Sequence, residues 1–173
     1  MDITIKYSIA LVVVALCMYT DIKYGKIKNI FSVVLIISSI IILIVFRETD
    51  IKEKILGLIV PFVLGFPLYA LRMFGAGDIK LFCSLGFMFG LNWILWCMAY
   101  SIFFGGAIAL FIIIKSKNAK ERLYYLFSYI KFTILTLRFT PYQNFEKNST
   151  STFPFAIAIF FGCVIKMSLQ FVK

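Results

Sequence analysis

The stretch LFCSLGFMFGLNWILWCMAYSIFFGGAIALFIII, residues 81–114, contains no charged residue. A helix crosses the apolar core of a bilayer with about 20 residues, so this run is too long for one span. The sequence Gly90-Leu91-Asn92-Trp93 is a turn signal inside it, and Trp93 is an aromatic residue of the kind found at the membrane interface. We therefore expect two spans here, a short one over residues 79–90 and a second one after it.

Four further apolar runs lie on either side of this stretch. They cover residues 3–20, 30–46, 55–71 and 153–172. The third run contains Pro61, Gly65 and Pro67, which predict a kink and weak final turns. Hydrophobic residues make up 62% of the 173 residues, whereas soluble domains have about 45–50%. We expect one all-α domain over residues 1–173, a polytopic membrane bundle of six transmembrane helices.

The net charge of +10 comes from basic residues that lie mostly between the apolar runs. Three connections on one side of the expected bundle, residues 21–29, 72–80 and 115–152, carry Lys23, Lys26, Lys28, Arg72, Lys80, Lys115, Lys117, Lys120, Arg122, Lys131, Arg138 and Lys147. Cytoplasmic loops are enriched in such residues, so we expect these connections in the cytoplasm and both termini outside. The cations suit anionic membrane lipid, and no nucleic-acid partner is expected.

Two segments leave alternatives open. Residues 118–139 have apolar side chains at helical spacing with polar ones between them, which favours an interfacial helix on the cytoplasmic surface. A seventh span is the alternative there, and Lys131 in its middle argues against it. The first apolar run could be a cleaved signal peptide, but the sequence before Asp21 has no A-x-A site.

Two polar motifs adjoin spans on the predicted cytoplasmic side, and each contains one aspartate. The first is DIKYGKIKN, residues 21–29, which begins with Asp21, and the second is GAGDIK, residues 75–80, which contains Asp78. A carboxylate beside hydrocarbon is costly unless it has a partner or a function, so the two are candidates for a shared site. The other acids lie in terminal or loop segments where we expect water to solvate them: Asp2, Glu48, Asp50, Glu53, Glu121 and Glu146.

Two neighbouring carboxylates are sufficient for peptide hydrolysis. One is ionised and takes a proton from water, while the other is protonated and donates to the carbonyl oxygen and then to the leaving amine. The two groups titrate as a pair. Gly75 and Gly77 have no Cβ, so we expect them to turn the backbone with positive φ and to let a substrate chain approach Asp78.

The residue types also limit the possible chemistry. There is no histidine, which excludes His-ligated metals and a Ser-His-Asp triad. The cysteines Cys17, Cys83, Cys97 and Cys163 lie far apart in apolar runs without a C-x-x-C spacing, so we expect them to be small apolar fillers in the bundle. We expect no metal and no cofactor.

Together the motifs resemble those of the type IV prepilin peptidases, which are GxGD-type intramembrane aspartyl proteases. The similarity is greatest to the short forms of tight-adherence pilus systems and to archaeal preflagellin peptidases. In the family, a first aspartate opens a D-x-x-x-x-x-I-P-N-like stretch; residues 21–29 match it, with Lys28 in place of proline. A second aspartate lies in G-x-G-D-x-K, which residues 75–80 match. The segment from Phe153-Pro154-Phe155-Ala156 to Gly162 is similar to the start of the family's last span.

The resemblance implies an aspartic-type endopeptidase with Asp21 and Asp78 as its catalytic residues. The residues that it implies in supporting roles are Gly75, Gly77, Lys80, Lys23 and Asn29. It implies a pilin-like precursor as the substrate, cleaved after a short basic leader at the cytoplasmic face of the inner or plasma membrane. Bifunctional members carry a large first cytoplasmic segment with paired C-x-x-C that is tied to N-methylation, and no such segment precedes Asp21, so methylation is not expected. The resemblance leaves the oligomeric state open.

Two other classes of function remain possible on the sequence alone. A small channel or transporter would use acids for protons or cations, but such acids usually lie near the middle of the membrane, whereas these lie at the ends of spans. A non-enzymatic subunit of pilus assembly would give neither Asp21 nor Asp78 a special role.

The distribution of charge makes a prediction about topology. A reporter fused after Lys173 should report the external side, and one fused after Lys117 should report the cytoplasmic side, because basic residues are retained in the cytoplasm. Paired fusions to alkaline phosphatase and a fluorescent protein measure this. A cytoplasmic signal after Lys173 would mean that residues 118–139 span the membrane or that the spans are miscounted.

Overall fold

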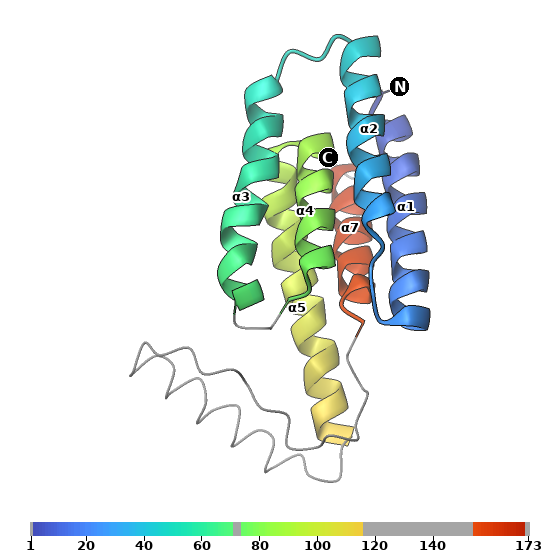
Figure 1. Cartoon of the computed structure of the whole chain (residues 1–173), viewed down its shortest axis with the longest axis vertical. Coiled ribbons are helices and arrows are strands. Elements are labelled where there is room, and N and C mark those ends of the chain that lie inside the picture. Colours follow the sequence, from blue (N-terminus) through green and yellow to red (C-terminus); the bar gives the residue numbers. More distant parts are fainter. Residues whose placement is uncertain (1, 71–73, 116–153, 172–173) are drawn as a thin grey trace.

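The computed structural model describes residues 2–70, 74–115 and 154–171, and these ranges contain helices and no strand. The helices are α1 (Asp2–Tyr24), α2 (Asn29–Val45), α3 (Ile51–Ala70), α4 (Ala76–Phe89), α5 (Leu91–Lys115) and α7 (Ala156–Phe171). They run alternately down and up in Figure 1, so that the two ends of the chain lie toward the upper part of the bundle. The all-α class is confirmed. The expected interfacial helix, residues 118–139, lies outside the described residues.

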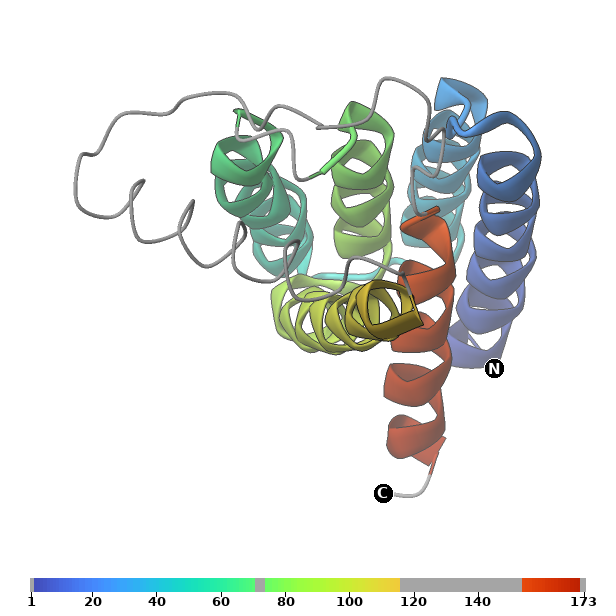
Figure 2. The ribbon, with the colours of Figure 1, turned by 90° about the horizontal axis from the view of Figure 1, so that it is seen from below.

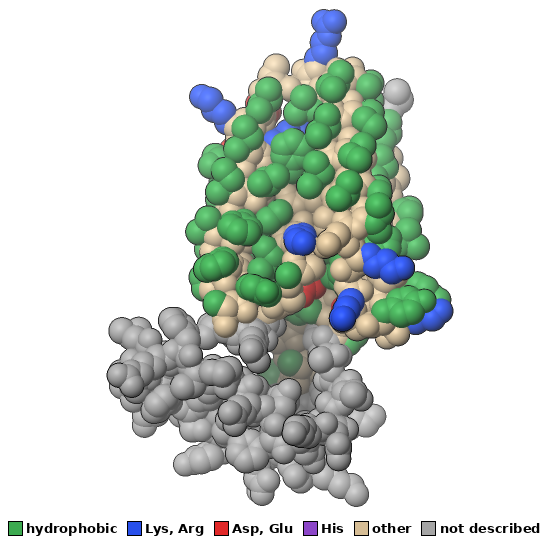
Figure 3. Space-filling view, in the orientation of Figure 1, with side chains coloured by type: hydrophobic (Ala, Val, Ile, Leu, Met, Phe, Trp, Pro, Cys, Tyr) green, Lys and Arg blue, Asp and Glu red, His purple; other side chains and the backbone are tan. Residues whose placement is uncertain are grey.

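The surface of the bundle is suited to lipid. In the described part of the chain, Ile3–Tyr24 and Leu91–Phe111 are long and apolar enough to cross a membrane, while Asn29–Val45 and Ala156–Gln170 are apolar but shorter. Hydrophobic side chains cover the visible side of the helical body, and most basic side chains lie toward its two ends (Figure 3). Such broad apolar exposure is unfavourable in water. The protein is therefore a membrane protein, and the number of spans stays a prediction.

The break between the fourth and fifth spans is where the sequence predicts it. Helix α4 is short, with 14 residues, and ends at Phe89. Gly90 follows with a φ of 89°, a left-handed conformation that favours glycine, and α5 begins at the next residue. The expected position of Trp93 at the membrane interface stays a prediction. This side chain is 5% exposed and stacks on Phe89 inside the bundle, with ring centroids 4.2 Å apart.

Two helices differ in detail from what the sequence suggests. Helix α1 extends past the expected end at Thr20 to Tyr24, so that Asp21 lies inside its last turns. Helix α3 continues through Pro61 and Pro67 to Ala70, and the predicted weakening of its last turns is not observed.

Helix α4 lies at the centre of the bundle, and its backbone contacts that of α3. A Cβ atom on Gly86 of α4 would collide with the carbonyl oxygen of Gly57 on α3, and a Cβ on Gly57 would collide with Gly86. Small residues of this kind let helices approach closely where lipid offers no hydrophobic driving force. Helix α4 also contacts α1, α2 and α5. Figure 2 shows it from below, between α3 and α2. Its residues Leu81, Phe82, Leu85 and Met88 are almost fully buried.

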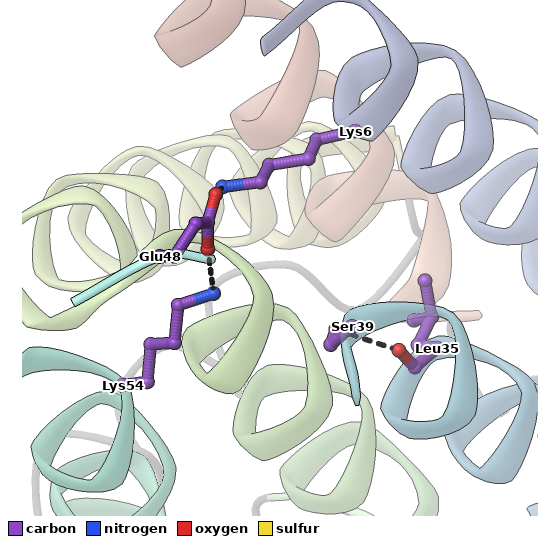
Figure 4. A network of polar contacts seen from close by, with 5 residues as sticks. All are labelled: Lys6, Leu35, Ser39, Glu48 and Lys54. Carbon is purple, nitrogen blue, oxygen red and sulfur yellow. Dashed lines mark hydrogen bonds and ion pairs between the residues drawn. The ribbon is translucent and has the colours of Figure 1, made fainter. Parts of the chain in front are cut away.

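A cluster of three charged residues closes the upper end of the bundle. The carboxylate of Glu48, in the connection between α2 and α3, lies between the ammonium groups of Lys6 on α1 and Lys54 on α3 (Figure 4). Lys54 is only 5% exposed. The expectation that water solvates Glu48 was therefore wrong, because two buried or partly buried cations occupy its oxygen atoms.

This cluster predicts a pH-dependent stability. Burial alone would raise the pKa of Glu48, but the hydrogen bonds and charges of Lys54 and Lys6 outweigh it and hold that pKa below its ordinary value. A carboxylate with a lowered folded-state pKa stabilises the fold above its unfolded pKa, about 4.3, and loses this contribution as the pH falls through the folded value. In detergent, Glu48→Gln should therefore be less stable than wild type by about 1–3 kcal/mol at pH 7. The difference should begin to shrink below the unfolded pKa of about 4.3 and should close only as the pH falls through the lowered folded-state pKa, where Glu48 itself becomes neutral.

Thermal unfolding across this pH range measures the effect. Glu53→Gln is the matched control, because Glu53 is an exposed acid at the start of α3, and it should change the midpoint little at any pH. Equal midpoints for Glu48→Gln and wild type at pH 7 would contradict a stabilising role for the cluster.

Candidate active site

The two aspartate motifs meet at the lower end of the bundle in Figure 1. This end is made by the last turns of α1 and by the first turns of α4 and α7. Asp21 comes from α1 and Asp78 from α4, and the two carboxylates are close enough for their charges to interact. The structure thus brings together two residues that the sequence singled out separately.

Asp78 is held at the start of its own helix. Its Oδ2 atom accepts a hydrogen bond from the backbone N–H of Gly75, at 3.0 Å, and its own N–H donates to the Gly75 carbonyl oxygen, at 3.2 Å. Gly75 is the N-cap residue of α4, so Asp78 stands at the third helical position, where a negative charge interacts favourably with the helix dipole. The residue is 7% exposed. Its carboxylate is therefore fixed in orientation and largely shielded from solvent.

Asp21, in the last turns of α1, is bound by the start of a different helix, α7. Its Oδ2 atom accepts a hydrogen bond from the backbone N–H of Ala156, the first residue of α7, at 3.2 Å. The first amides of a helix have no partner inside the helix, and an acceptor from elsewhere must satisfy them. Both carboxylates therefore receive a backbone N–H at a helix N-terminus. The sequence showed this part of α7 only as a pattern from Phe153 to Gly162, and the contact with Asp21 was not foreseen.

The glycines of the second motif do not act as expected. Gly75 has a φ of −78° and a ψ of 150°, which is ordinary extended backbone, and the glycines with positive φ in the described ranges are Gly25 and Gly90. The prediction of positive φ at Gly75 and Gly77 was therefore wrong. The left-handed glycine of the site is Gly25, in the first motif, with a φ of 62°. Its N–H donates to the carbonyl oxygen of Asp21, at 2.8 Å, and ends α1 one turn after the aspartate.

Gly77 is required for a close approach between the two motifs. A Cβ atom there would lie 2.9 Å from the Cβ of Ile27 and 3.4 Å from its carbonyl oxygen. A second contact lies nearby, where the ammonium of Lys80 donates to the side-chain oxygen of Asn29, at 3.0 Å. Gly77 therefore makes room for the chain's own first motif, whereas the sequence had suggested room for a substrate.

Lys23 is the expected supporting residue that lies apart from these contacts. Its ammonium lies 5.8 Å from the ring centroid of Tyr19 and 5.4 Å from that of Tyr24, and the side chain is exposed. These are cation–π contacts within the end of α1.

The inner side of the site is apolar. Cys17 lies one turn before Asp21 and is fully buried. Its thiol lies close enough to both aspartates to interact with their charges. Cys97 and Cys163 are also fully buried, so these three cysteines are fillers as predicted, while Cys83 is partly exposed. In the described part of the chain, no group of three or more His, Cys, Asp or Glu residues could hold a metal ion. The two carboxylates each keep lone pairs with which they can bind water.

Comparison with known proteins identifies a family. No curated protein and no solved structure matches the chain. The model of the type IV leader peptidase family matches residues 8–110, which include both aspartate motifs and most of the chain from α1 to α5. Because the match covers more than half of the sequence, and both motifs within it meet at one end of the helical bundle, this membrane protein belongs to the type IV leader peptidase family.

Proposed function

We propose that the chain is an aspartic endopeptidase in which Asp21 and Asp78 are the two catalytic residues. The observation that carries the proposal is that the two carboxylates lie at the same end of the bundle, on the contacting helices α1 and α4, each held by a backbone amide at a helix N-terminus. The family match supports peptidase activity. A shared pair of carboxylates that binds one water is the arrangement that acid–base hydrolysis of a peptide bond requires.

The reaction follows from the two protonation states of the pair. Like charges close together do not ionise together readily, so the pair holds one proton between its members. The ionised aspartate removes a proton from the bound water, which attacks the scissile carbonyl carbon. The protonated aspartate donates to the carbonyl oxygen, and collapse of the tetrahedral intermediate then transfers a proton to the leaving amine. The amides of Gly75 and Ala156 keep both carboxylates oriented during these steps.

The proposed substrate is a pilin-like precursor that has a short basic leader before a hydrophobic helix. The family supports a precursor of this kind. The apolar sides of the bundle would let the hydrophobic helix of the substrate approach within the membrane, and the position of the pair at the end of the bundle corresponds to cleavage at the membrane edge. The basic residues of the neighbouring connections favour the cytoplasmic edge. The same position disfavours a channel or transporter, whose acids would lie near mid-membrane.

Substitution of either aspartate tests the catalytic pair. Asp21→Asn and Asp78→Asn should each reduce cleavage by at least about 10²-fold, because asparagine keeps the size of the side chain but acts neither as base nor as acid. The measurement is leader removal from pilin-like precursors of the same genome, co-expressed or reconstituted with the purified protein and followed as a shortened product.

Glu53→Gln replaces an exposed acid at the other end of the bundle and should cleave at the wild-type rate. Glu48→Gln is unsuitable as this control because Glu48 pairs with Lys6 and Lys54. Cleavage near the wild-type rate by either aspartate variant would show that the pair is not catalytic.

The packing between the motifs makes a second prediction. Gly77→Ala should reduce cleavage by about tenfold or more, because the new Cβ would push Ile27 and the first motif away from Asp78, and small misplacements of catalytic groups are costly. Gly106→Ala is the matched control, because open space surrounds Gly106. Alanine has a higher helix propensity than glycine, so this effect is the same for Gly77 in α4 and for Gly106 in α5. Equal cleavage by both variants would mean that the contact between Gly77 and Ile27 does not position the pair.

A further inference from the structure

The start of α7 contacts both aspartate-bearing segments, although it lies outside the part of the chain that the family model matches. The amide of Ala156 donates to Asp21. The preceding side chain, Phe155, packs on Phe74, which directly precedes Gly75, with ring centroids 4.6 Å apart. Its ring also meets the edge of Phe82, one turn after Asp78, with centroids 6.5 Å apart. Phe155, just before α7, and Ala156, its first residue, thus contact the two halves of the candidate active site.

The position of this segment is narrowly defined by its neighbours. Gly105 of α5 has no side chain at the place where the Phe155 ring lies, and a Cβ there would be 2.6 Å from Cε2 of that ring. Further along the helix, a Cβ on Gly162 would collide with Ser101 of α5. Ala156 itself has no exposed surface. Helix α7 is therefore packed closely on α5 along its length, and its first amide has little freedom to move relative to Asp21.

We propose that the N-terminus of α7 is the positioning element of the active site: the Ala156 amide orients the Asp21 carboxylate, and Phe155 keeps that amide in register with the Gly75–Asp78 turn. This inference rests on the proposed function of the two aspartates. A hydrogen bond from a backbone amide to one carboxylate oxygen selects one orientation of the side chain, and it is stronger when the acceptor is ionised. The helix dipole adds a favourable field at the same point.

A single substitution removes the amide without removing the helix. Proline has no N–H, and it is well tolerated at the first helical position, where the N–H has no partner inside the helix. Ala156→Pro should therefore lower kcat by about 10- to 100-fold while KM changes little, because the substrate still binds but Asp21 is no longer held in place. Ala156→Val adds similar bulk and keeps the N–H, so its kcat should exceed that of Ala156→Pro by at least about tenfold.

The outcomes distinguish the amide from packing. Equal losses in Ala156→Pro and Ala156→Val, or a wild-type kcat in Ala156→Pro, would overturn the proposal. A loss confined to KM would also overturn it, because a positioning group acts on the catalytic step. Thermal unfolding of both variants in detergent reports whether each protein is folded.

A second pair of variants tests the proposal if Ala156→Pro does not fold. Phe155→Ala removes the ring between α7 and the Gly75–Asp78 turn without touching either carboxylate, and it should lower kcat about tenfold or more. Phe161→Ala removes a half-exposed ring from the same helix and should leave kcat unchanged. Equal kcat values for these two variants would overturn the proposal.

The failure of this proposal differs from a failure of the proposed function. If Asp21→Asn and Asp78→Asn are inactive while Ala156→Pro and Phe155→Ala keep the wild-type kcat, the catalytic role of the aspartate pair is supported and the positioning role of α7 is refuted. If the aspartate variants remain active, the proposed function itself falls.

Discussion

The structure depends on how two carboxylates are accommodated at the edge of an apolar bundle. A carboxylate near lipid needs hydrogen-bond donors. Burying further polar groups in an apolar environment to serve as donors would cost additional free energy, so donors that are already present are favoured. The unpaired amides at the start of a helix meet this need, because each helix exposes them in any case. Here α4 provides such a donor for Asp78 through Gly75, and α7 provides one for Asp21 through Ala156. The ends of these helices must therefore converge, and this convergence defines the site.

Convergence is possible because the helices approach one another at glycines. Gly57 and Gly86 bring the backbones of α3 and α4 into contact, and Gly162 brings α7 close to the backbone of α5. Gly105 makes room for the Phe155 ring, and Gly77 admits Ile27 beside the start of α4. In each case the missing Cβ is a requirement of packing and not of backbone conformation, since the positive φ angles of the described glycines are found at Gly25 and Gly90. In this way the bundle holds the two proposed catalytic segments, which come from distant parts of the chain, with few residues.

The two ends of the bundle are built from different kinds of polar interaction. At the end with the aspartates, the carboxylates accept hydrogen bonds from backbone amides, whereas at the opposite end Glu48 is neutralised by Lys6 and Lys54. A carboxylate bound between two ammonium groups is poorly suited to proton transfer, because its charged form is strongly favoured. The same residue type thus has a structural role at one end and a proposed catalytic role at the other. Its partners alone decide which role it has.

The sequence by itself determined the membrane class, the approximate positions of the described helices, the break at Gly90 and the two aspartate motifs. These features depend on local composition and on the length of apolar runs, which a single chain displays without any knowledge of its neighbours. Only the tertiary structure decided which groups the motifs contact. Asp21 and Ala156 are 135 residues apart in the chain, and Lys6 and Glu48 are 42 apart, so no local pattern predicts either contact. Gly77 of the G-x-G-D motif shows the same limit of prediction from the sequence. Its lack of a side chain is visible in the sequence, but the neighbour that requires this, Ile27, is defined only when the connection between α1 and α2 packs against the start of α4.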